Sequence, residues 1–292
     1  MIAKEILKKV RRIQILTSRK VTDLMAGQYS SVFKGRGMEF KEVRHYQPGD
    51  DVRLIDWNVS ARTGIPHVKE HVEERELTVM LLVDASLSLD FGTIEKTKME
   101  LAAEFAAIVA FSAINNNDKV GLIVFTDQIE LFVPPKKGKR HVLRVIREML
   151  AFKPTHRGTD VGGALEYLRK VTTRRTITFL ISDFLAQGYE RALSLANKRH
   201  DLVAVPVSDP AESALPRIPA LVALLDQETG RYLEADGRSS RVLGGYARRT
   251  EASRAARGEA FRSRGVDRVE IRTDKDPVEP LFRYFRERER RH

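Results

Sequence analysis

Hydrophobic and polar residues alternate in long blocks from residue 77 onward. Four aliphatic runs have the length and composition of strands that are buried on both faces: 77–84, 119–127, 175–183 and 201–209. The segments between them carry apolar residues at helical spacing and predict helices at 95–117, 139–152, 161–173 and 189–200. Buried strands separated by helices predict an α/β fold in which a mostly parallel sheet lies between helices.

The same reasoning extends the domain to the C-terminus. Residues 129–135 follow a turn and are expected to add a short antiparallel strand at one edge of the sheet. A β-hairpin is predicted at 220–235, followed by a long Arg- and Ala-rich helix around 240–263. A strand at 266–271 and a closing helix complete the predicted domain.

The N-terminal quarter of the chain has a different pattern, so we predict two parts, 1–75 and 76–292. The first part opens with a basic amphipathic helix and continues with a small, strand-rich module of glycines, turns and charges. Trp57, the only tryptophan, is expected to anchor the core of this module. QPGDD is expected to form a turn, and three arginines are expected to pair with three aspartates: Arg44, Arg53 and Arg62 with Asp50, Asp51 and Asp56.

Composition narrows the class of protein. With 292 residues and 42% hydrophobic content, the chain can bury a substantial core. Its apolar stretches are shorter than the roughly 18 residues of a membrane-spanning helix, and charges interrupt the N-terminus where a signal peptide needs an apolar block. We therefore expect a soluble, cytoplasmic protein. Because cysteine is absent, any metal must bind oxygen or histidine ligands.

The basic charge is concentrated at the N-terminus. The net charge is +11, and the first twenty residues hold seven Lys or Arg against one Glu. This helix and the KKGKRH segment leave open a role in binding nucleic acid or an anionic membrane. The structural alternative, which we favour, packs the apolar face of the helix on the main domain and leaves the basic side chains in water. That face consists of Ile2, Ile6, Val10 and Ile13.

Polar residues gather where two of the predicted strands end. DASLS continues from the first strand, SD closes the strand at 175–183, and a Gly-Thr pair precedes the helix between them. Ligands of such sheets bind beyond the carboxyl ends of the strands, where these segments are expected to meet. The candidate metal ligands are Asp84, Ser86, Ser88, Thr159 and Asp183.

Carboxylate and hydroxyl oxygens are the ligands that Mg²⁺ prefers. Each residue also has an ordinary structural interpretation: Ser86, Ser88, Thr159 or Asp160 as a helix cap, and Asp183 as a turn residue. The coincidence of three oxygen-rich segments at one edge favours the metal site. An ion held directly by neutral hydroxyls, with carboxylates acting through water, would stay underneutralised and favour an acidic group from a partner. Asp90 and Asp160 lie nearby but outside the pattern.

The spacing of these residues resembles the metal-ion-dependent adhesion site of von Willebrand factor A domains, with all five positions present. The order of strands and helices from about residue 77 also resembles that Rossmann-like fold. Upstream, GRGMEFKEVRHYQPGDDVRLIDWNVSARTG followed by VKEHVEERE resembles the signature of a bacterial family of unknown biochemical function, in which this segment precedes a von Willebrand factor A-like domain.

The resemblance implies a protein-interaction domain that depends on Mg²⁺, or on Mn²⁺ or Ca²⁺, and that is not an enzyme. It implies a partner as well: a MoxR-type AAA+ ATPase, or the client protein which that ATPase assembles or activates, held through an acidic residue that completes the metal site. Many relatives carry membrane helices before the signature, and this chain has none there.

Enzymatic alternatives fit less well. HVKEH matches a zinc-peptidase pattern, but it alternates like a strand, which would separate His67 and His71 by roughly 13 Å. Walker A, G-x-G-x-x-G and G-x-S-x-G motifs are absent. A phosphatase-like, Mg²⁺-dependent hydrolase stays open, although its nucleophile would need a second carboxylate where this chain has Ser86.

Overall fold

The structure is a computed structural model of the chain, and it describes residues 29, 39–72, 76–225, 230 and 232–291. Two compact units are present. One is Phe33–Leu77, and the other is the α/β domain from Thr78 to the C-terminus, to which Tyr29 also belongs. The predicted N-terminal basic helix, with its apolar face at Ile2, Ile6, Val10 and Ile13, lies outside the described residues.

A parallel core forms the centre of the main sheet. β3 (Thr78–Asp84) pairs in parallel with β4 (Lys119–Phe125) on one side and with β6 (Ile177–Ser182) on the other. β7 (Asp201–Ser208) continues the parallel sheet beyond β6. Every residue of β3 after Thr78 is buried, as expected for aliphatic strands with helices on both faces.

The two edges of the sheet differ. β5 (Ile129–Lys136) pairs antiparallel with β4, which confirms the expected edge strand. At the other edge, the predicted strand at 266–271 is split into β10 (Asp267–Arg268) and β11 (Ile271–Arg272), which both pair with β7. Both pieces keep the same register, and Pro206 lies opposite the gap. Since proline has no N–H to donate, the hydrogen-bonded ladder is interrupted there.

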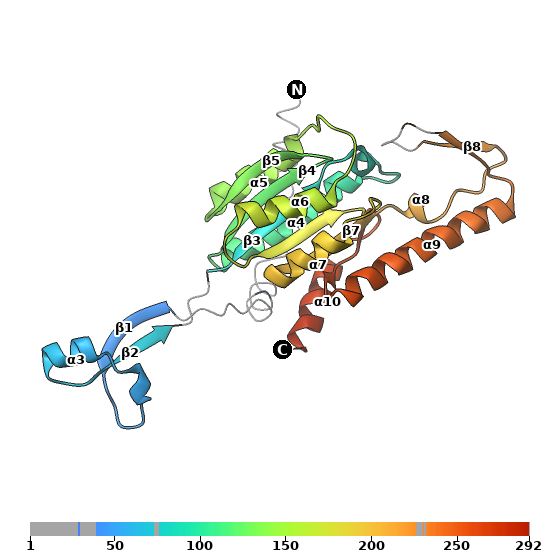
Figure 1. Cartoon of the computed structure of the whole chain (residues 1–292). Helices are drawn as coiled ribbons and strands as arrows, with labels where there is room; N and C mark the ends of the chain where they lie inside the picture. Colours follow the sequence, from blue (N-terminus) through green and yellow to red (C-terminus); the bar gives the residue numbers. More distant parts are fainter. Residues whose placement is uncertain (1–28, 30–38, 73–75, 226–229, 231, 292) are drawn as a thin grey trace. The chain divides into compact units, whose positions relative to one another are not determined.

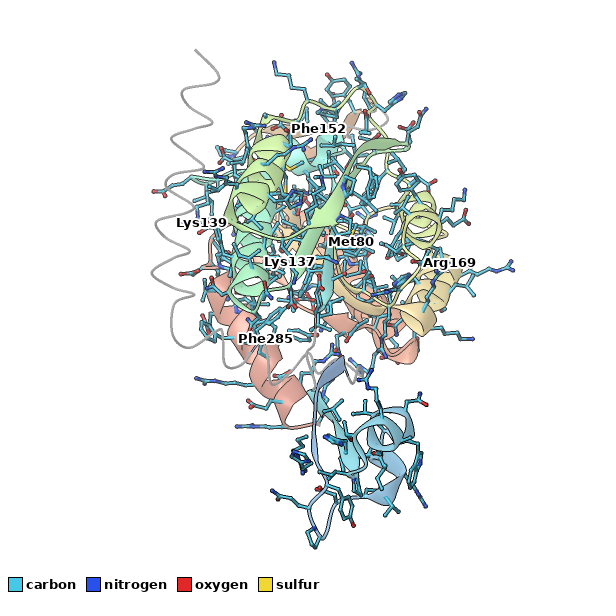
Figure 2. The ribbon with its side chains drawn as sticks, turned by 90° about the vertical axis from the view of Figure 1, so that its left-hand side faces the viewer. Met80, Lys137, Lys139, Phe152, Arg169 and Phe285 are labelled. Atoms are coloured by element: carbon cyan, nitrogen blue, oxygen red, sulfur yellow. The ribbon has the colours of Figure 1, made fainter. Side chains whose placement is uncertain are left out.

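Helices lie on both faces of the sheet, so the predicted layers are confirmed (Figure 1). On one face α4 (Lys98–Asn115) packs against α5 (Lys139–Ala151). On the other face α6 (Val161–Val171) packs against α7 (Glu190–Arg199). Figure 2 shows Met80 of β3 inside the domain, whereas Arg169 at the end of α6 points away from it.

The last third of the chain matches the predicted order. After the short α8 (Pro210–Ser213), β8 (Leu221–Leu225) and β9 (Tyr232–Asp236) form the predicted antiparallel hairpin. The long α9 (Ser240–Ser263) follows, and α10 (Val278–Glu289) closes the domain. Among the residues that the structure describes, we find no helix long and apolar enough to cross a membrane.

The smaller unit is built on a two-stranded sheet. β1 (Glu39–His45) pairs antiparallel with β2 (His67–Val72), and between them lie a 3₁₀ turn, η1 (Val52–Leu54), and α3 (Trp57–Thr63). The HVKEH segment is therefore a strand, as the alternation predicted. QPGDD forms the expected turn, in which the backbone N–H of Asp50 donates to the carbonyl of Gln47.

Polar residues of this module stabilise its turns. The predicted ion pair between Arg44 and Asp50 is present, with two nitrogen–oxygen distances of 2.7 and 2.8 Å. The carboxylate of Asp51 accepts a hydrogen bond from the backbone N–H of Arg53 at the start of η1. Asp56 caps α3. The aspartates of this segment thus fix backbone turns as well as side chains.

The prediction that Trp57 anchors a core is wrong. Its side chain is 69% exposed, and Val52 and Ile65 nearby in the sequence are 60% and 52% exposed. Trp57 is the first residue of a helix of seven residues, none of which is buried. Such a short helix on a two-stranded sheet has no enclosed interior for an indole ring to fill.

The exposure of Trp57 predicts a fluorescence result. Because it is the only tryptophan, emission and acrylamide quenching report this residue alone. We expect the folded chain to show quenching close to that of the same chain in denaturant. Strong protection of the indole in the monomeric, folded chain would contradict this exposure.

A buried histidine supports the start of β7. His200 is 1% exposed, and its Nδ1 accepts a hydrogen bond from the backbone N–H of Thr176 at 3.3 Å. Burial, together with the charges of nearby arginines, lowers the pKa of His200 to about 4. The side chain is therefore neutral at physiological pH.

This histidine predicts a loss of stability in acid. Since its folded-state pKa lies below the unfolded value, the unfolded chain binds more protons between about pH 6.5 and 4. The stabilisation is complete above about pH 6.5, and about 2–3 kcal/mol should be lost as the pH falls to 4. In urea unfolding at both pH values, His200→Gln should lose less free energy of unfolding than the wild type. An equal loss in both proteins would show that His200 does not carry this effect.

Candidate metal centre

The candidate residues lie at the point where the strand order reverses. From edge to edge the strands run β5, β4, β3, β6, β7 and β10, so β3 has the next strand of the chain on one side and β6 on the other. The chain leaves β3 for α4 on one face and leaves β6 for α7 on the opposite face. In sheets of this kind, ligands bind at the carboxyl ends of two strands whose connections diverge in this way.

Asp84 joins the ends of β3 and β6. It is fully buried, and its Oδ1 accepts a hydrogen bond from the backbone N–H of Ser86 at 2.9 Å. Its Oδ2 accepts one from the hydroxyl of Ser182 at 2.6 Å. The Ser182 hydroxyl in turn accepts from the N–H of Phe184 at 3.0 Å. These bonds fix the Asp84 carboxylate at the carboxyl end of β3.

The two serines after Asp84 bring their hydroxyls together. Ser86 Oγ lies 3.0 Å from Ser88 Oγ, across the first turn of a short 3₁₀ helix, η2 (Leu87–Asp90). The Ser86 side chain makes no capping bond to that turn, and the next long helix, α4, is capped by Thr97. Ser86 therefore does not act as a helix cap through its side chain, which was its structural interpretation.

Asp183, the residue after β6, carries the second carboxylate. It is 3% exposed, and its Oδ2 lies 3.0 Å from the ammonium nitrogen of Lys98. Its Oδ1 accepts a hydrogen bond from the N–H of Leu185 at 3.2 Å, in the turn that the structural alternative predicted. Phe184 between them has a φ of 55°, a strained value for a residue with a side chain. Aromatic contacts with Tyr189 and Phe261 hold it in place.

The two carboxylates repel each other in a dry environment. Burial, together with the charge of Asp183, raises the pKa of Asp84 to about 7, although hydrogen bonds from Ser182 and Ser86 oppose the increase. Such a pair is costly when both groups are ionised. A cation near them would relieve this cost.

The loop before α6 reaches the same edge of the sheet. The backbone N–H of Asp160 donates to the carbonyl of Thr126, just beyond β4, at 2.8 Å. The Asp160 side chain caps α6 through the N–H of Gly163, so its structural interpretation is confirmed. Thr159 precedes it and is half-buried. The structure thus brings Asp84, Ser86, Ser88 and Asp183 together and places Thr159 on the adjoining loop.

The residue types fit a hard divalent cation. Two carboxylates and paired hydroxyls supply oxygen ligands of the kind that Mg²⁺ prefers, and water usually completes its octahedron. Within the described part of the chain, no group of three or more His, Asp or Glu side chains is placed to hold a metal. A site here would accordingly depend on hydroxyls and water, which hold an ion less tightly than a cluster of carboxylates.

Three further residues belong to this cluster and were missed by sequence reasoning. Ser182 could have been found, since it precedes Asp183 at the strand end. Glu212 forms a capping box with Asp209, a pattern visible as D-P-A-E in the sequence. Lys98 gives no such signal, because a lysine in the first turn of a helix is ordinarily exposed.

The topology defines the class of protein: a mostly parallel sheet with an antiparallel edge strand and helices on both faces makes this an α/β domain. Residues 42–256 match the family described as "Protein of unknown function DUF58". This chain belongs to that family. The predicted membership of a family of unknown function, which rested on the signature in the N-terminal part of the chain, is thereby confirmed.

Relatives of this chain are found by sequence, and similar chains are found among solved structures. The uncharacterized protein Rv1480 of Mycobacterium tuberculosis is 34% identical over 285 residues, which cover 96% of this chain and 89% of the relative. An aerotolerance-related membrane protein from Bacteroides fragilis is 15% identical, with a TM-score of 0.49 and coverage of 74% of this chain and 100% of that chain. The SpRpn10 VWA domain is 13% identical, with a TM-score of 0.41 and coverage of 71% and 94%.

Substitutions of the two aspartates should have opposite effects on the free energy of unfolding when divalent ions are chelated. Asp84→Asn removes a repulsive charge and keeps an acceptor for Ser86, so its free energy of unfolding should equal or exceed that of the wild type. Asp183→Asn weakens a buried ion pair with Lys98 and should cost about 1–3 kcal/mol. Urea unfolding in EDTA measures both. A clear destabilisation by Asp84→Asn would contradict the repulsion between the two carboxylates.

Proposed function

We propose that this protein is a divalent-cation-dependent interaction domain and not an enzyme. In the proposal, Asp84, Ser86, Ser88, Thr159 and Asp183 hold Mg²⁺, or Mn²⁺ or Ca²⁺ in its place. The observation that carries it is the pair of buried, mutually repelling carboxylates beside two hydroxyls that lie 3.0 Å apart. Positive charge at this position would balance a group of atoms that is otherwise costly to bury.

The chemistry of the ligands supports binding to an acidic partner. Serine hydroxyls are neutral, and one of the two carboxylates, Asp183, is already paired with Lys98. A bound divalent ion would therefore keep excess positive charge and could accept a carboxylate in an open coordination position. In this proposal the hydroxyls of Ser86 and Ser88 bind the ion. Asp84 holds both serines in place through its hydrogen bond with the N–H of Ser86.

The proposed partner is a MoxR-type AAA+ ATPase or a client protein that such an ATPase assembles or activates. Its support is the resemblance of residues 35–75 to the family signature. The smaller unit, Phe33–Leu77, is called the signature module here because it carries most of the family signature. It adds a surface suited to protein contact, because four of its large apolar side chains are exposed: Val52, Leu54, Trp57 and Ile65. An ATP-consuming partner also favours the cytoplasm as the place of action.

The proposal predicts that partner capture depends on both the ion and the serines. The tagged full-length chain should retain a MoxR-type ATPase or its client from the native cell extract in Mg²⁺. In EDTA the retained amount should fall at least about tenfold, which corresponds to about 1.4 kcal/mol of binding free energy. Ser86→Ala/Ser88→Ala should give the same loss in Mg²⁺. Quantitative mass spectrometry of the eluates measures both effects.

A matched control is Ser194→Ala, which removes a half-buried hydroxyl on α7 that donates to the carbonyl of Glu190. It should leave capture unchanged. The same partners retained in EDTA and by the double serine variant would sink the cation-dependent mechanism. Turnover of generic phosphatase substrates that requires Mg²⁺ and Asp84 would instead favour the hydrolase alternative.

A further inference from the structure

A fully buried lysine lies beside the candidate metal centre. Lys98 is the first residue of α4 and has no exposed surface, which is rare for lysine without paired charges. Its ammonium nitrogen lies 3.0 Å from Oδ2 of Asp183 and also donates to Oε1 of Glu212. Burial by itself would lower the pKa of Lys98, but the charges of Asp183 and Glu212 outweigh it and raise the pKa. The side chain is therefore a permanent cation.

The second partner of this lysine is held rigidly. Glu212 belongs to the first turn of α8, where its Oε2 accepts a hydrogen bond from the backbone N–H of Asp209 at 2.9 Å. Asp209 is itself buried and accepts hydrogen bonds from the hydroxyls of Thr93 and Thr273, at 2.6 and 2.7 Å. This network fixes a second carboxylate, that of Glu212, against Lys98. Lys98 can thus give up part of its bond to Asp183 and still keep a counter-charge.

We propose that Lys98 acts as the resident counter-ion of the metal centre and limits how tightly the centre holds a divalent cation. The inference rests on the proposed function, since it concerns the same site. With Lys98 paired to Asp183, only Asp84 remains as an uncompensated carboxylate, so an incoming ion must compete with the ammonium group for Asp183. Ion binding would move the lysine's pairing toward Glu212. The free chain then holds an ion weakly, and a partner's carboxylate supplies the missing negative charge.

Two substitutions are expected to change ion affinity in opposite directions. Lys98→Met keeps the length of the side chain but removes the competing charge, so the dissociation constant for Mg²⁺ should fall about tenfold or more. Glu212→Gln leaves Asp183 as the main counter-charge of Lys98, so the dissociation constant should rise by about threefold or more. Calorimetric titration of the full chain with MgCl₂ measures both, after treatment with EDTA and its removal.

Thermal unfolding supplies a second readout. Lys98→Met leaves Asp183 buried without its cation, which should lower the melting temperature in EDTA. Added Mg²⁺ should then raise the melting temperature of this variant by more than it raises that of the wild type. Lys96→Met is the matched control, because Lys96 pairs with Glu104 and not with the centre. It should leave Mg²⁺ affinity unchanged.

The outcomes separate this inference from the proposed function. If the wild type binds Mg²⁺ and Lys98→Met binds it equally or less tightly, the role of Lys98 is overturned and the metal centre stands. If neither the wild type nor a folded Lys98→Met binds Mg²⁺, the proposed function fails as well. Should Lys98→Met not fold, Glu212→Gln decides: weaker binding supports the competition, and unchanged or tighter binding overturns it.

Discussion

The structure around the candidate metal centre depends on the enforced proximity of two acidic strand ends. β3 and β6 are hydrogen-bonded neighbours although long stretches of sequence separate them. β3 ends at Asp84 and β6 is followed directly by Asp183, and both aspartates are almost completely buried. The sheet cannot relax this repulsion by moving the strands apart, because their aliphatic residues form the core. The charge must therefore be balanced locally, by hydrogen bonds, by a cation or by protonation.

Several local features serve this balance. Ser182 donates to Asp84, Lys98 donates to Asp183, and Arg257 donates to the backbone carbonyl of Asp183 at 2.9 Å. Phe184 adopts a strained backbone conformation immediately after Asp183, and its ring is buried among other aromatic rings. Strain and buried charge of this kind reduce stability, so their concentration at one sheet edge is expected of a binding site rather than of a purely structural one.

In contrast to the sheet edge with its buried charges, the signature module holds charged residues in local turns and exposes several large apolar side chains. Its charged residues form local turns and caps, as with Arg44 and Asp50, while Trp57 and neighbouring aliphatic side chains remain exposed. Aromatic side chains are enriched at protein interfaces. In the proposed function, the buried ionic centre on one unit and the exposed apolar side chains on the other would be two distinct ways for one chain to contact other proteins.

The sequence by itself determined the fold class, because the aliphatic runs at 77–84 and 175–183 have the length and composition of buried strands and the intervening segments have helical periodicity. It also identified Asp84 and Asp183 as strand-end residues, since both follow directly from the ends of those runs. It did not determine what surrounds them. Only the tertiary structure decided that Lys98 would be buried against Asp183 and that Trp57 would be exposed. Both outcomes depend on contacts, or on missing contacts, between segments that local pattern does not relate.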